Sequence, residues 1–441
     1  MKKDEFDLIV DKKLFPMIGT LTKNADKSYT SRRVLTIESD RYLDHHRFNN
    51  VPYLPGVMGL EFFAELVKFL QPEKQIVKFE NVEFKSAIRL KDDQPQEIQT
   101  DIEFNENSAK AVITSQVIKD GKVTDETKLH FKSEITFGKR ETETIKLPPE
   151  KKMPLLNKQF IYEILPHGPL LHVLTEINHI EEDILAVSKL KKKQLMSWKH
   201  KEFLINPLSI EACFQALGLM DFIDCGRAGL PSKIGQLIFY KTKSEPYFII
   251  GQKKGDVEKG GLFDFQLVTK KGEVVVKAID FQTIEINLGE TTNILERIRS
   301  HQIRMLYNIP KLAWLEVVSN SLLKDKLSRE PEFIGAFLHP EEISEFDKVD
   351  EKEQMKIIPE LYAQKRALRI VLRTANMYDF KINLDEKGDP FCQYKNKMIY
   401  LTTKGIENYT LAMASYRRKV EIELTQKEEL LKKIIKKVKT K

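Results

Sequence analysis

The sequence predicts an α+β fold in which a long apolar helix is wrapped by an antiparallel sheet, and in which this unit occurs twice. Short runs of alternating apolar and polar residues, typical of strands, fill the chain from about residue 7 to residue 287. Two longer apolar runs open at Pro55 and Pro207, where proline suits the first turn of a helix. Beyond residue 287 helical patterns dominate, which predicts a separate C-terminal α+β domain.

The expected strands fall into two sets on either side of the Pro148-Pro149 pair. We therefore assign residues 1–150 to a first helix-and-sheet repeat and residues 151–290 to a second. The strands expected in the first repeat are residues 77–88, 96–104 and 110–118. Those expected in the second are residues 184–191, 233–240, 247–251, 262–270 and 273–286, with a hairpin turn at residues 270–273.

The two apolar helices carry polar side chains at matching places. Glu61 is followed four residues later by Glu65, and Glu211 is followed four residues later by Gln215. A spacing of four places both members of a pair on one helical face. Each helix is thus expected to present a polar site from an otherwise apolar surface.

The C-terminal third of the chain is divided by its patterns into a helical linker, a small domain and a tail. The linker spans residues 291–330, the domain residues 331–420 and the basic amphipathic tail residues 421–441. The helices expected here are residues 294–307, 313–323 and 353–377, followed by a β stretch over residues 379–414.

Composition limits the class of protein. With 41% hydrophobic and 31% charged residues, the chain is expected to be globular, and its 441 residues suffice for two or three domains. Acidic residues at the N-terminus and the lack of a long apolar stretch predict a cytoplasmic protein without a signal peptide or membrane span. Three cysteines without C-x-x-C spacing predict neither disulfides nor a metal site.

One loop carries the strongest chemical signal. His46 is followed by two prolines and by Gly56, which opens the first helix. A neutral imidazole can remove the proton α to a thioester carbonyl, and the N–H groups at the Pro55-Gly56 helix start can hold the carbonyl oxygen as it gains charge. A departing β-hydroxyl needs an acid kept protonated by apolar surroundings, for which Glu211 is the candidate, with Gln215 orienting the hydroxyl.

Residues 46–55 resemble the H-x-x-x-G-x-x-x-x-P motif of the double-hotdog dehydratase domains of polyketide and polyunsaturated fatty acid synthases. Residues 206–219 resemble their second motif, the D-x-x-x-Q helix. The resemblance covers residues 7–287 and implies a double-hotdog fold that dehydrates a 3-hydroxyacyl thioester, with His46 as base and Glu211 as acid.

The flanking segments extend the resemblance. Residues 15–19 are similar to the family's opening segment, and Tyr162 with His167-Gly168-Pro169 is similar to its Tyr…Gly-Pro element. This implies that Tyr162, His167 and Gly168 line the acyl-binding tunnel. Glu61 matches the glutamate of standalone hydroxyacyl dehydratases and is expected to contact substrate as well.

Two positions depart from the dehydratase motifs. Asn50 stands at the motif glycine, and asparagine tolerates the left-handed backbone better than other non-glycine residues. Glu211 stands where the family has aspartate, which moves the acid by about one bond length, and a displacement on the order of 1 Å can cost roughly a hundredfold in rate.

Residues 330–416 resemble, more faintly, the phosphopantetheinyl transferase superfamily. The similar segments are residues 337–342, 362–367 and 382–390. Arg366 stands where the family has a metal-binding glutamate, and no G-x-D segment precedes it, so we expect no Mg²⁺ here and interpret the domain as a pseudoenzyme. Lys365 and the basic tail are expected to attract a carrier protein or a phosphopantetheine phosphate.

The leading hypothesis is therefore a dehydratase acting on an acyl chain carried on phosphopantetheine, with no metal or redox cofactor. Its expected partners are an acyl carrier protein or a synthase polypeptide, with no nucleic acid and no membrane; the net charge of +7 suits an acidic partner. The alternatives are a carrier-binding scaffold without turnover, a phosphopantetheinyl transferase and a hotdog thioesterase.

Overall fold

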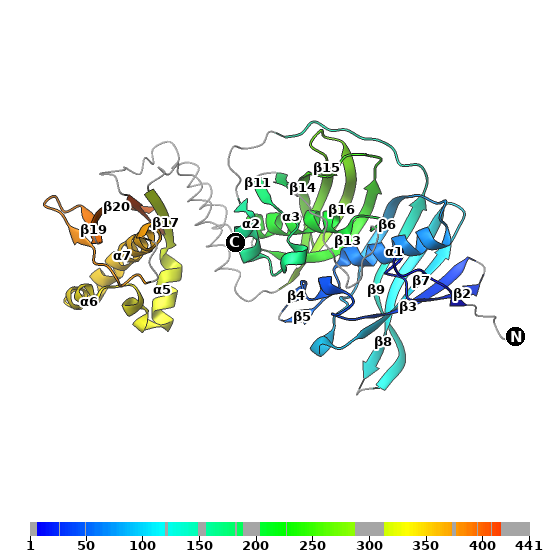
Figure 1. Ribbon diagram of the computed structural model, residues 1–441, viewed down its shortest axis with the longest axis horizontal. Helices are drawn as coiled ribbons and strands as arrows, with labels where there is room; N and C mark the ends of the chain where they lie inside the picture. Colours follow the sequence, from blue (N-terminus) through cyan, green and yellow to red (C-terminus); the bar gives the residue numbers. More distant parts are fainter. Residues whose placement is uncertain are drawn as a thin grey trace. The chain divides into compact units, whose positions relative to one another are not determined.

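The computed structural model describes residues 7–286 and 313–415, apart from residues 26, 49, 120–121, 149–155, 181–182, 188–202, 226, 373–375, 395 and 407 (Figure 1). The chain forms two compact units, residues 1–288 and residues 289–441. Each is described by itself. Within the described residues, no helix combines the length and apolar character needed to cross a membrane.

The first unit is built on one antiparallel sheet of fourteen strands. Its first half contains β1 (Asp7–Leu8), β2 (Thr20–Ala25), β3 (Ser28–Leu35), β6 (Ile76–Phe84), β7 (Gln96–Phe104), β8 (Ser108–Lys119) and β9 (Lys122–Phe137). Its second half contains β10 (Leu156–Asn157), β11 (Glu176–Ile180), β12 (Asp183–Val187), β13 (Ala228–Phe239), β14 (Phe248–Val257), β15 (Gly260–Val268) and β16 (Val274–Ile286).

The two halves repeat one topology. From the outer edge inwards the strands run β1-β2-β3-β7-β8-β9-β6 in the first half and β10-β11-β12-β14-β15-β16-β13 in the second. In each half the innermost strand, β6 or β13, is the first strand that follows the long apolar helix in the chain. β6 and β13 pair with each other, for example Phe79 with Leu237, and so join the halves into one sheet. The predicted repetition of a helix-and-sheet unit is confirmed, with the added finding that the sheet is continuous.

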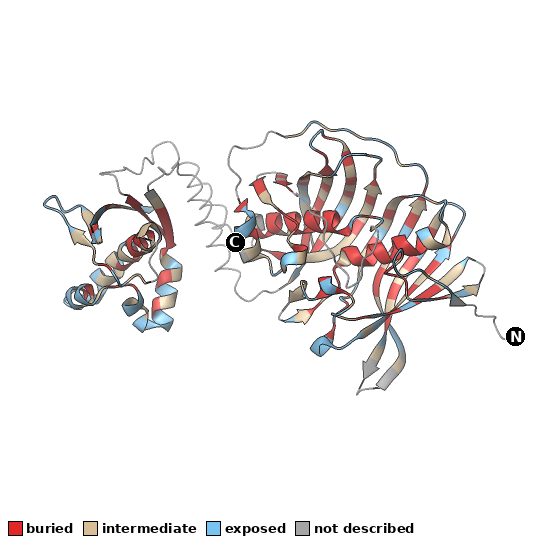
Figure 2. Ribbon diagram, viewed as in Figure 1, coloured by how far each residue is buried: buried red, intermediate tan, exposed pale blue. Residues whose placement is uncertain are grey.

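Two long helices lie against this sheet and touch each other (Figure 1). They are α1 (Gly56–Leu70) and α3 (Pro207–Cys225); the short α2 (Lys158–Ile164) precedes β11. Every residue of α1 from Val57 to Val67 is buried, and α3 is red along most of its length in Figure 2. Helices that are apolar nearly all round belong in a core, and one apolar cluster runs through both halves.

The second unit is a five-stranded antiparallel sheet with helices packed on it. Its strands, in the order β17-β21-β20-β19-β18, are β17 (Ala313–Ser319), β18 (Asn383–Leu384), β19 (Pro390–Tyr394), β20 (Lys397–Ile406) and β21 (Tyr409–Ser415). Its helices are α5 (Asn320–Arg329), α6 (Pro340–Phe346) and α7 (Glu351–Leu372). α7 packs on β17 and β21.

The helix expected at residues 313–323 is wrong in its first half. Residues 313–319 form β17, which pairs along its whole length with β21, and helix α5 starts only at Asn320. The buried side chains of Leu315, Val317 and Val318 fit a strand that packs in a core, a long-range contact that local periodicity does not reveal. Because β17 and α5 belong to the second unit, the expected linker over residues 291–330 is wrong in that part. The expected helix at 294–307 and the tail at 421–441 lie outside the described residues.

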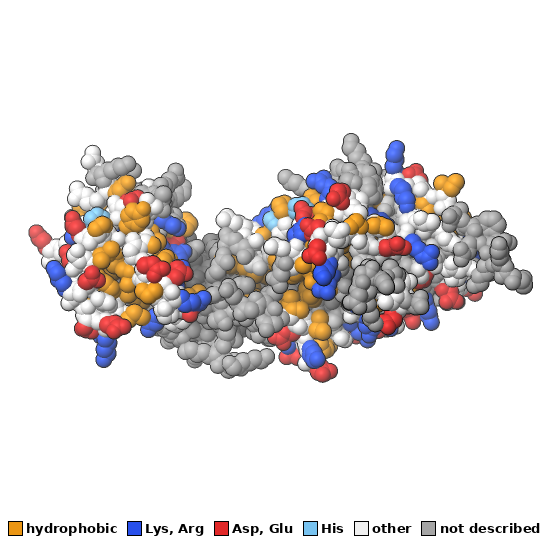
Figure 3. Space-filling model, turned by 90° about the horizontal axis from the view of Figure 1, so that it is seen from below, with side chains coloured by type: hydrophobic (Ala, Val, Ile, Leu, Met, Phe, Trp, Pro, Cys, Tyr) orange, Lys and Arg blue, Asp and Glu red, His pale blue; other side chains and the backbone are white. Residues whose placement is uncertain are grey.

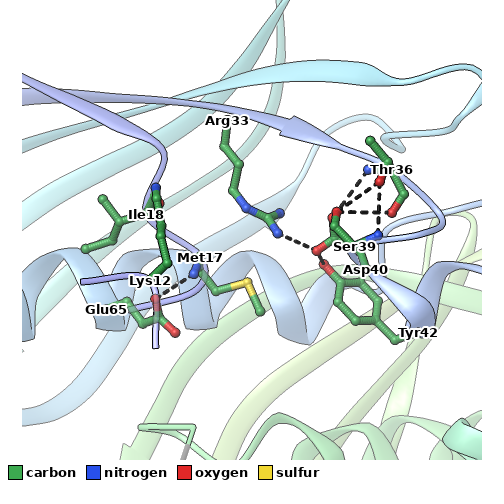
Figure 4. A network of polar contacts seen from close by, with 9 residues as sticks. All are labelled: Lys12, Met17, Ile18, Arg33, Thr36, Ser39, Asp40, Tyr42 and Glu65. Atoms are coloured by element: carbon green, nitrogen blue, oxygen red, sulfur yellow. Dashed lines mark hydrogen bonds and ion pairs between the residues drawn. The ribbon is translucent and has the colours of Figure 1, made fainter. Parts of the chain in front are cut away.

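A buried polar network anchors the start of the first unit (Figure 4). The Arg33 guanidinium donates to Asp40 at 2.5 Å, and Asp40 also accepts hydrogen bonds from the hydroxyls of Tyr42, at 3.1 Å, and Ser39, at 2.6 Å. Asp40 is 0% exposed and Arg33 9%. The Asp40 carboxylate is thus surrounded by hydrogen-bond donors, as a buried charge requires. Asp40 directly precedes the 3₁₀ turn Arg41–Leu43 that leads into the His46 loop.

Glu65 of α1 holds the neighbouring segment in the same region of Figure 4. Its carboxylate accepts the N–H of Met17 at 2.7 Å, and the Lys12 ammonium donates to the Ile18 carbonyl. Burial, and then the charge of nearby Glu61, raise the pKa of Glu65 well above its ordinary value. Through this buried carboxyl, α1 holds the backbone of residues 15–19 at Met17.

We predict that Asp40→Ala destabilises the first unit by about 3–5 kcal/mol, because it leaves the Arg33 charge buried and unpaired. Urea unfolding, followed by far-ultraviolet circular dichroism, measures the loss in free energy of unfolding. The matched control is Asp44→Ala, which removes a half-exposed partner of Arg47 at 2.8 Å and is expected to cost less than about 1 kcal/mol. Equal losses for the two variants would contradict the prediction.

Candidate active site

The loop before α1 fixes the orientation of His46. The loop folds back through the short strands β4 (Arg47–Phe48) and β5 (Val51–Pro52), and Asn50 between them adopts φ 64°, the left-handed conformation expected of it. The His46 ring places Nδ1 2.9 Å from the Tyr53 carbonyl oxygen. That oxygen can only accept, so Nδ1 carries the hydrogen and Nε2 keeps a free lone pair. This is the tautomer that a base requires.

The second half of the unit reaches the same loop through a backbone bridge. His46 and His167 form an isolated antiparallel β-bridge, and the Gly168 N–H donates to the His45 carbonyl at 2.8 Å. A Cβ on Gly168 would lie 3.0 Å from the Cα of His45 and closer still to its ring nitrogen. Glycine is therefore required for close approach of two backbones, a role other than the substrate contact expected from the sequence.

The carboxylate of Glu211, on α3, lies close to the rings of His46 and His167. One of its carboxylate oxygens lies 3.4 Å from His167 Nε2, and one ring nitrogen of each histidine lies within 4.8 Å of a Glu211 oxygen. Glu211 is only 5% exposed. The structure thus brings His46 and Glu211, predicted from two motifs far apart in the sequence, into one cluster and adds His167.

Gln215 and Tyr162 form a chain of hydrogen bonds behind Glu211. The Gln215 amide nitrogen donates to Glu211 at 3.0 Å and to the Leu171 carbonyl at 3.1 Å, while its oxygen accepts from the Tyr162 hydroxyl at 3.0 Å. The Leu174 N–H donates in turn to the Tyr162 oxygen at 2.7 Å. Both side chains were expected to contact substrate, but their polar atoms are engaged within the protein, so they position Glu211.

Glu61 also has a different role from the one expected. It is fully buried, and its two oxygens accept the N–H groups of Leu204, at 2.6 Å, and Ile205, at 3.1 Å. Burial raises the pKa of Glu61 to about 7. With both oxygens taken by backbone, Glu61 anchors the segment that leads into α3 and is not placed to contact substrate.

Pro55 and Gly56 stand at the start of α1, with Gly56 as its first residue. A Cβ on Gly56 would come 2.8 Å from a ring carbon of Phe84, so a larger residue would disturb the helix start. Tyr53, whose carbonyl oxygen orients the His46 ring, lies three residues before Gly56. The role of this helix start in holding a carbonyl oxygen stays a prediction.

The electrostatics of the cluster set the charge of each group. Burial, and then the neighbouring His167, lower the pKa of His46 to about 4, so the ring is neutral at pH 7. Burial acts to raise the pKa of Glu211, but His167, His46 and the Gln215 hydrogen bond outweigh it and lower that pKa below its ordinary value. The surroundings of Glu211 are therefore not the apolar ones expected from the sequence, because two imidazoles face its carboxyl.

His167 is the residue of the cluster to which sequence analysis gave no chemical role. It was expected only to line the acyl-binding tunnel, and the signal that could have marked it is an imidazole placed directly before a glycine of close approach. Two histidines and a carboxylate are also a frequent metal-ligand set. Here the His167 contact and the Gln215 hydrogen bond already account for the position of Glu211.

In the second unit the cations of the degenerate motif are engaged in ion pairs. Arg366 Nε donates to Glu316 Oε2 at 3.0 Å, and Glu316, on β17, is 1% exposed. Lys365 is completely buried and pairs with Glu342 at 2.5 Å. The expectation that Lys365 attracts a phosphate is therefore wrong, because its ammonium does not reach the surface. Glu316 is an acidic residue upstream that sequence analysis missed.

Comparison with known proteins agrees with this architecture. Residues 15–116 match the family model described as the polyketide synthase dehydratase domain. The search of curated proteins gives no significant match. Among solved structures, the dehydratase domain from the CurF module of curacin polyketide synthase is 18% identical, with a TM-score of 0.51 over 62% of this chain and 100% of that domain.

Two further structures are similar to the same extent. A dehydratase domain of a trans-AT polyketide synthase from Brevibacillus brevis is 17% identical, with a TM-score of 0.53 over 63% of this chain and 100% of that one. The dehydratase from the CurJ module of curacin polyketide synthase is 16% identical, with a TM-score of 0.52 over 62% and 99%. At these identities the likeness shows the fold, which is that of polyketide synthase dehydratase domains. The family match covers residues 15–116, which include the His46 loop and α1.

We predict that the His46 ring stays neutral until the pH falls to about 4. The unfolded chain protonates His46 near pH 6.5, so its burial contributes stability above that pH, and the contribution is lost as the pH falls below it. Nuclear magnetic resonance of ¹⁵N-histidine, with His46→Gln to assign the signal, measures the titration. The urea-unfolded chain is the control, and a folded-state midpoint near 6.5 would contradict the prediction.

Proposed function

We propose that this chain eliminates water from a 3-hydroxyacyl thioester carried on the phosphopantetheine arm of an acyl carrier protein, in polyketide or fatty acid biosynthesis. The observation that supports it best is the placement of a neutral His46, with a free Nε2, beside the Glu211 carboxyl across the two halves of the fold. A base and an acid a few ångströms apart suit the removal of a proton and a hydroxide from adjacent carbons.

In the proposed reaction His46 Nε2 takes the proton α to the thioester carbonyl. The carbonyl oxygen gains negative charge, which the N–H groups at the start of α1 stabilise. The bond from the β-carbon to the hydroxyl then breaks, and the hydroxyl takes a proton from the Glu211 side of the site. The products are an α,β-unsaturated thioester and water, and the step needs neither a redox cofactor nor a metal.

The proposed partner is an acidic carrier protein, alone or within a synthase polypeptide. The net charge of +7 favours an acidic partner in general. Among the side chains coloured in Figure 3, however, Lys and Arg lie side by side with Asp and Glu and form no single large basic patch. Net charge would then steer encounter, while local contacts select the carrier.

A second candidate is a carrier-binding protein with little or no turnover. It is favoured by the second unit, where the Arg366–Glu316 and Lys365–Glu342 pairs neutralise the acidic side chains near the degenerate motif. Phosphopantetheinyl transfer is disfavoured by the same pairs, because a carboxylate held by a guanidinium is a poor ligand for Mg²⁺.

We predict that mass spectrometry of a carrier-bound 3-hydroxyacyl chain shows loss of one water after incubation with the protein. His46→Ala and Glu211→Gln are each expected to slow this loss by about 10²–10⁴-fold, because each removes one proton-transfer group. The matched control is Glu97→Gln, an exposed carboxylate on β7, which is expected to leave the rate unchanged.

Full activity of His46→Ala would overturn the assigned base. Tight binding of the carrier with no water loss at any chain length would instead support the scaffold, and release of free thiol would indicate thioester hydrolysis.

A further inference from the structure

His167 is built into the cluster as firmly as His46. Its backbone is held by the bridge to His46 and by the contact of the His172 ring with the His167 carbonyl at 2.9 Å. Its Nε2 lies 3.4 Å from Glu211, and the centres of the two imidazole rings are 5.3 Å apart. Its Nδ1 is buried and has no hydrogen-bond partner among the described residues. A buried polar atom without a partner is costly to keep for packing alone.

We propose that His167 and Glu211 share the proton that the departing hydroxyl takes, so that the acid of this site is the pair and not Glu211 alone. This deepens the dehydratase function proposed above and rests on it. Glu211 remains the group that touches the reacting atoms, and His167 acts through Glu211 as a positioning residue and proton store.

The contacts of Glu211 favour such a store. The His167 contact and the Gln215 hydrogen bond act against burial and favour the ionised form of Glu211, and a carboxylate has no proton to give. A proton placed on His167 completes an imidazolium–carboxylate pair. This pair can rearrange to neutral imidazole and carboxylic acid across the 3.4 Å contact when the hydroxyl begins to leave.

The proposed step balances. The α C–H bond breaks and its proton goes to His46; its electrons form the new double bond; and the β C–O bond breaks with its electrons on the hydroxyl. The hydroxyl takes the shared proton and leaves as water. His167 is then neutral, Glu211 ionised and His46 protonated. Return of the His46 proton to His167, whose ring is its neighbour, restores the starting state.

The other titratable groups around the pair do not compete for this role. Tyr162 lies behind Gln215, and Cys213 is two residues after Glu211 on α3; burial raises the pKa of both well above the ordinary values, so both stay neutral. His172 contacts the His167 carbonyl and stacks on Tyr162 with ring centres 3.8 Å apart. His46, held by Tyr53, serves as the base.

The decisive variant is His167→Gln, because glutamine keeps an N–H that can donate to Glu211 but does not carry a proton at neutral pH. At pH 7.5 we expect kcat to fall about 10–100-fold with KM changed less than about twofold. At pH 5 the deficit relative to the wild-type chain is expected to shrink at least threefold, because the variant lacks the His167 contact that lowers the pKa of Glu211, so Glu211 takes up a proton from solvent more readily as the pH falls. A deficit equal at both pH values, or none, overturns the proposal.

Two further measurements separate this inference from its premise. His167→Gln/Glu211→Gln is expected to be no slower than Glu211→Gln, since both changes disable one acid. Independently of turnover, the ¹⁵N resonances of the His167 ring are expected to show more imidazolium in the wild-type chain than in Glu211→Gln at the same pH, because the variant lacks the carboxylate that shares the proton. A neutral ring in both overturns the pair.

The outcomes are distinguishable. If the wild-type chain dehydrates no substrate, the proposed function fails while the ring resonances still decide whether the proton is shared. If the wild-type chain is active and His167→Gln equals it, only the shared acid fails. Near-ultraviolet circular dichroism of each variant confirms that a loss of rate is not a loss of fold.

Discussion

The backbone contact between His45-His46 and His167-Gly168 is the constraint on which the site depends. It is short because Gly168 has no side chain, and it crosses from the first half of the fold to the second. Without it, the proposed base His46 and the proposed acid Glu211 would belong to two separate surfaces. The continuous sheet through β6 and β13 aligns the halves, but this contact sets the distance between their reactive groups.

Other buried polar groups hold the remaining parts of the site in place. Glu61 of α1 fixes the segment before α3, and Gln215 with Tyr162 fixes the carboxyl of Glu211. At the other end of the loop, the Arg33–Asp40 pair fixes the chain that leads to His46. A polar group buried with all its hydrogen bonds made is rigid, and rigidity on the scale of an ångström is what proton transfer between neighbouring groups requires.

Local patterns in the sequence were sufficient for the repeated fold and for the positions of His46 and Glu211. Strand β7 was predicted to the residue, because its alternation is regular, and both long helices begin within one residue of the expected proline. Contacts between distant segments could not be predicted. Residues 313–319 form a strand because they pair with β21. The backbone N–H groups of Leu204 and Ile205 donate hydrogen bonds to both oxygens of Glu61. The backbone bridge to His46 brings His167 close to Glu211. The polar surroundings of Glu211 were missed for the same reason, since they depend on that neighbour.

The repeated topology has an evolutionary consequence. In a symmetric homodimer every substitution appears twice, so both copies of a site change together. Here the two halves are encoded separately, and the corresponding helices have diverged: the carboxylates of α1 bind backbone, whereas that of α3 faces two imidazoles. Joining two copies in one chain allows the helix of one copy to specialise in holding the architecture and that of the other in the proposed chemistry.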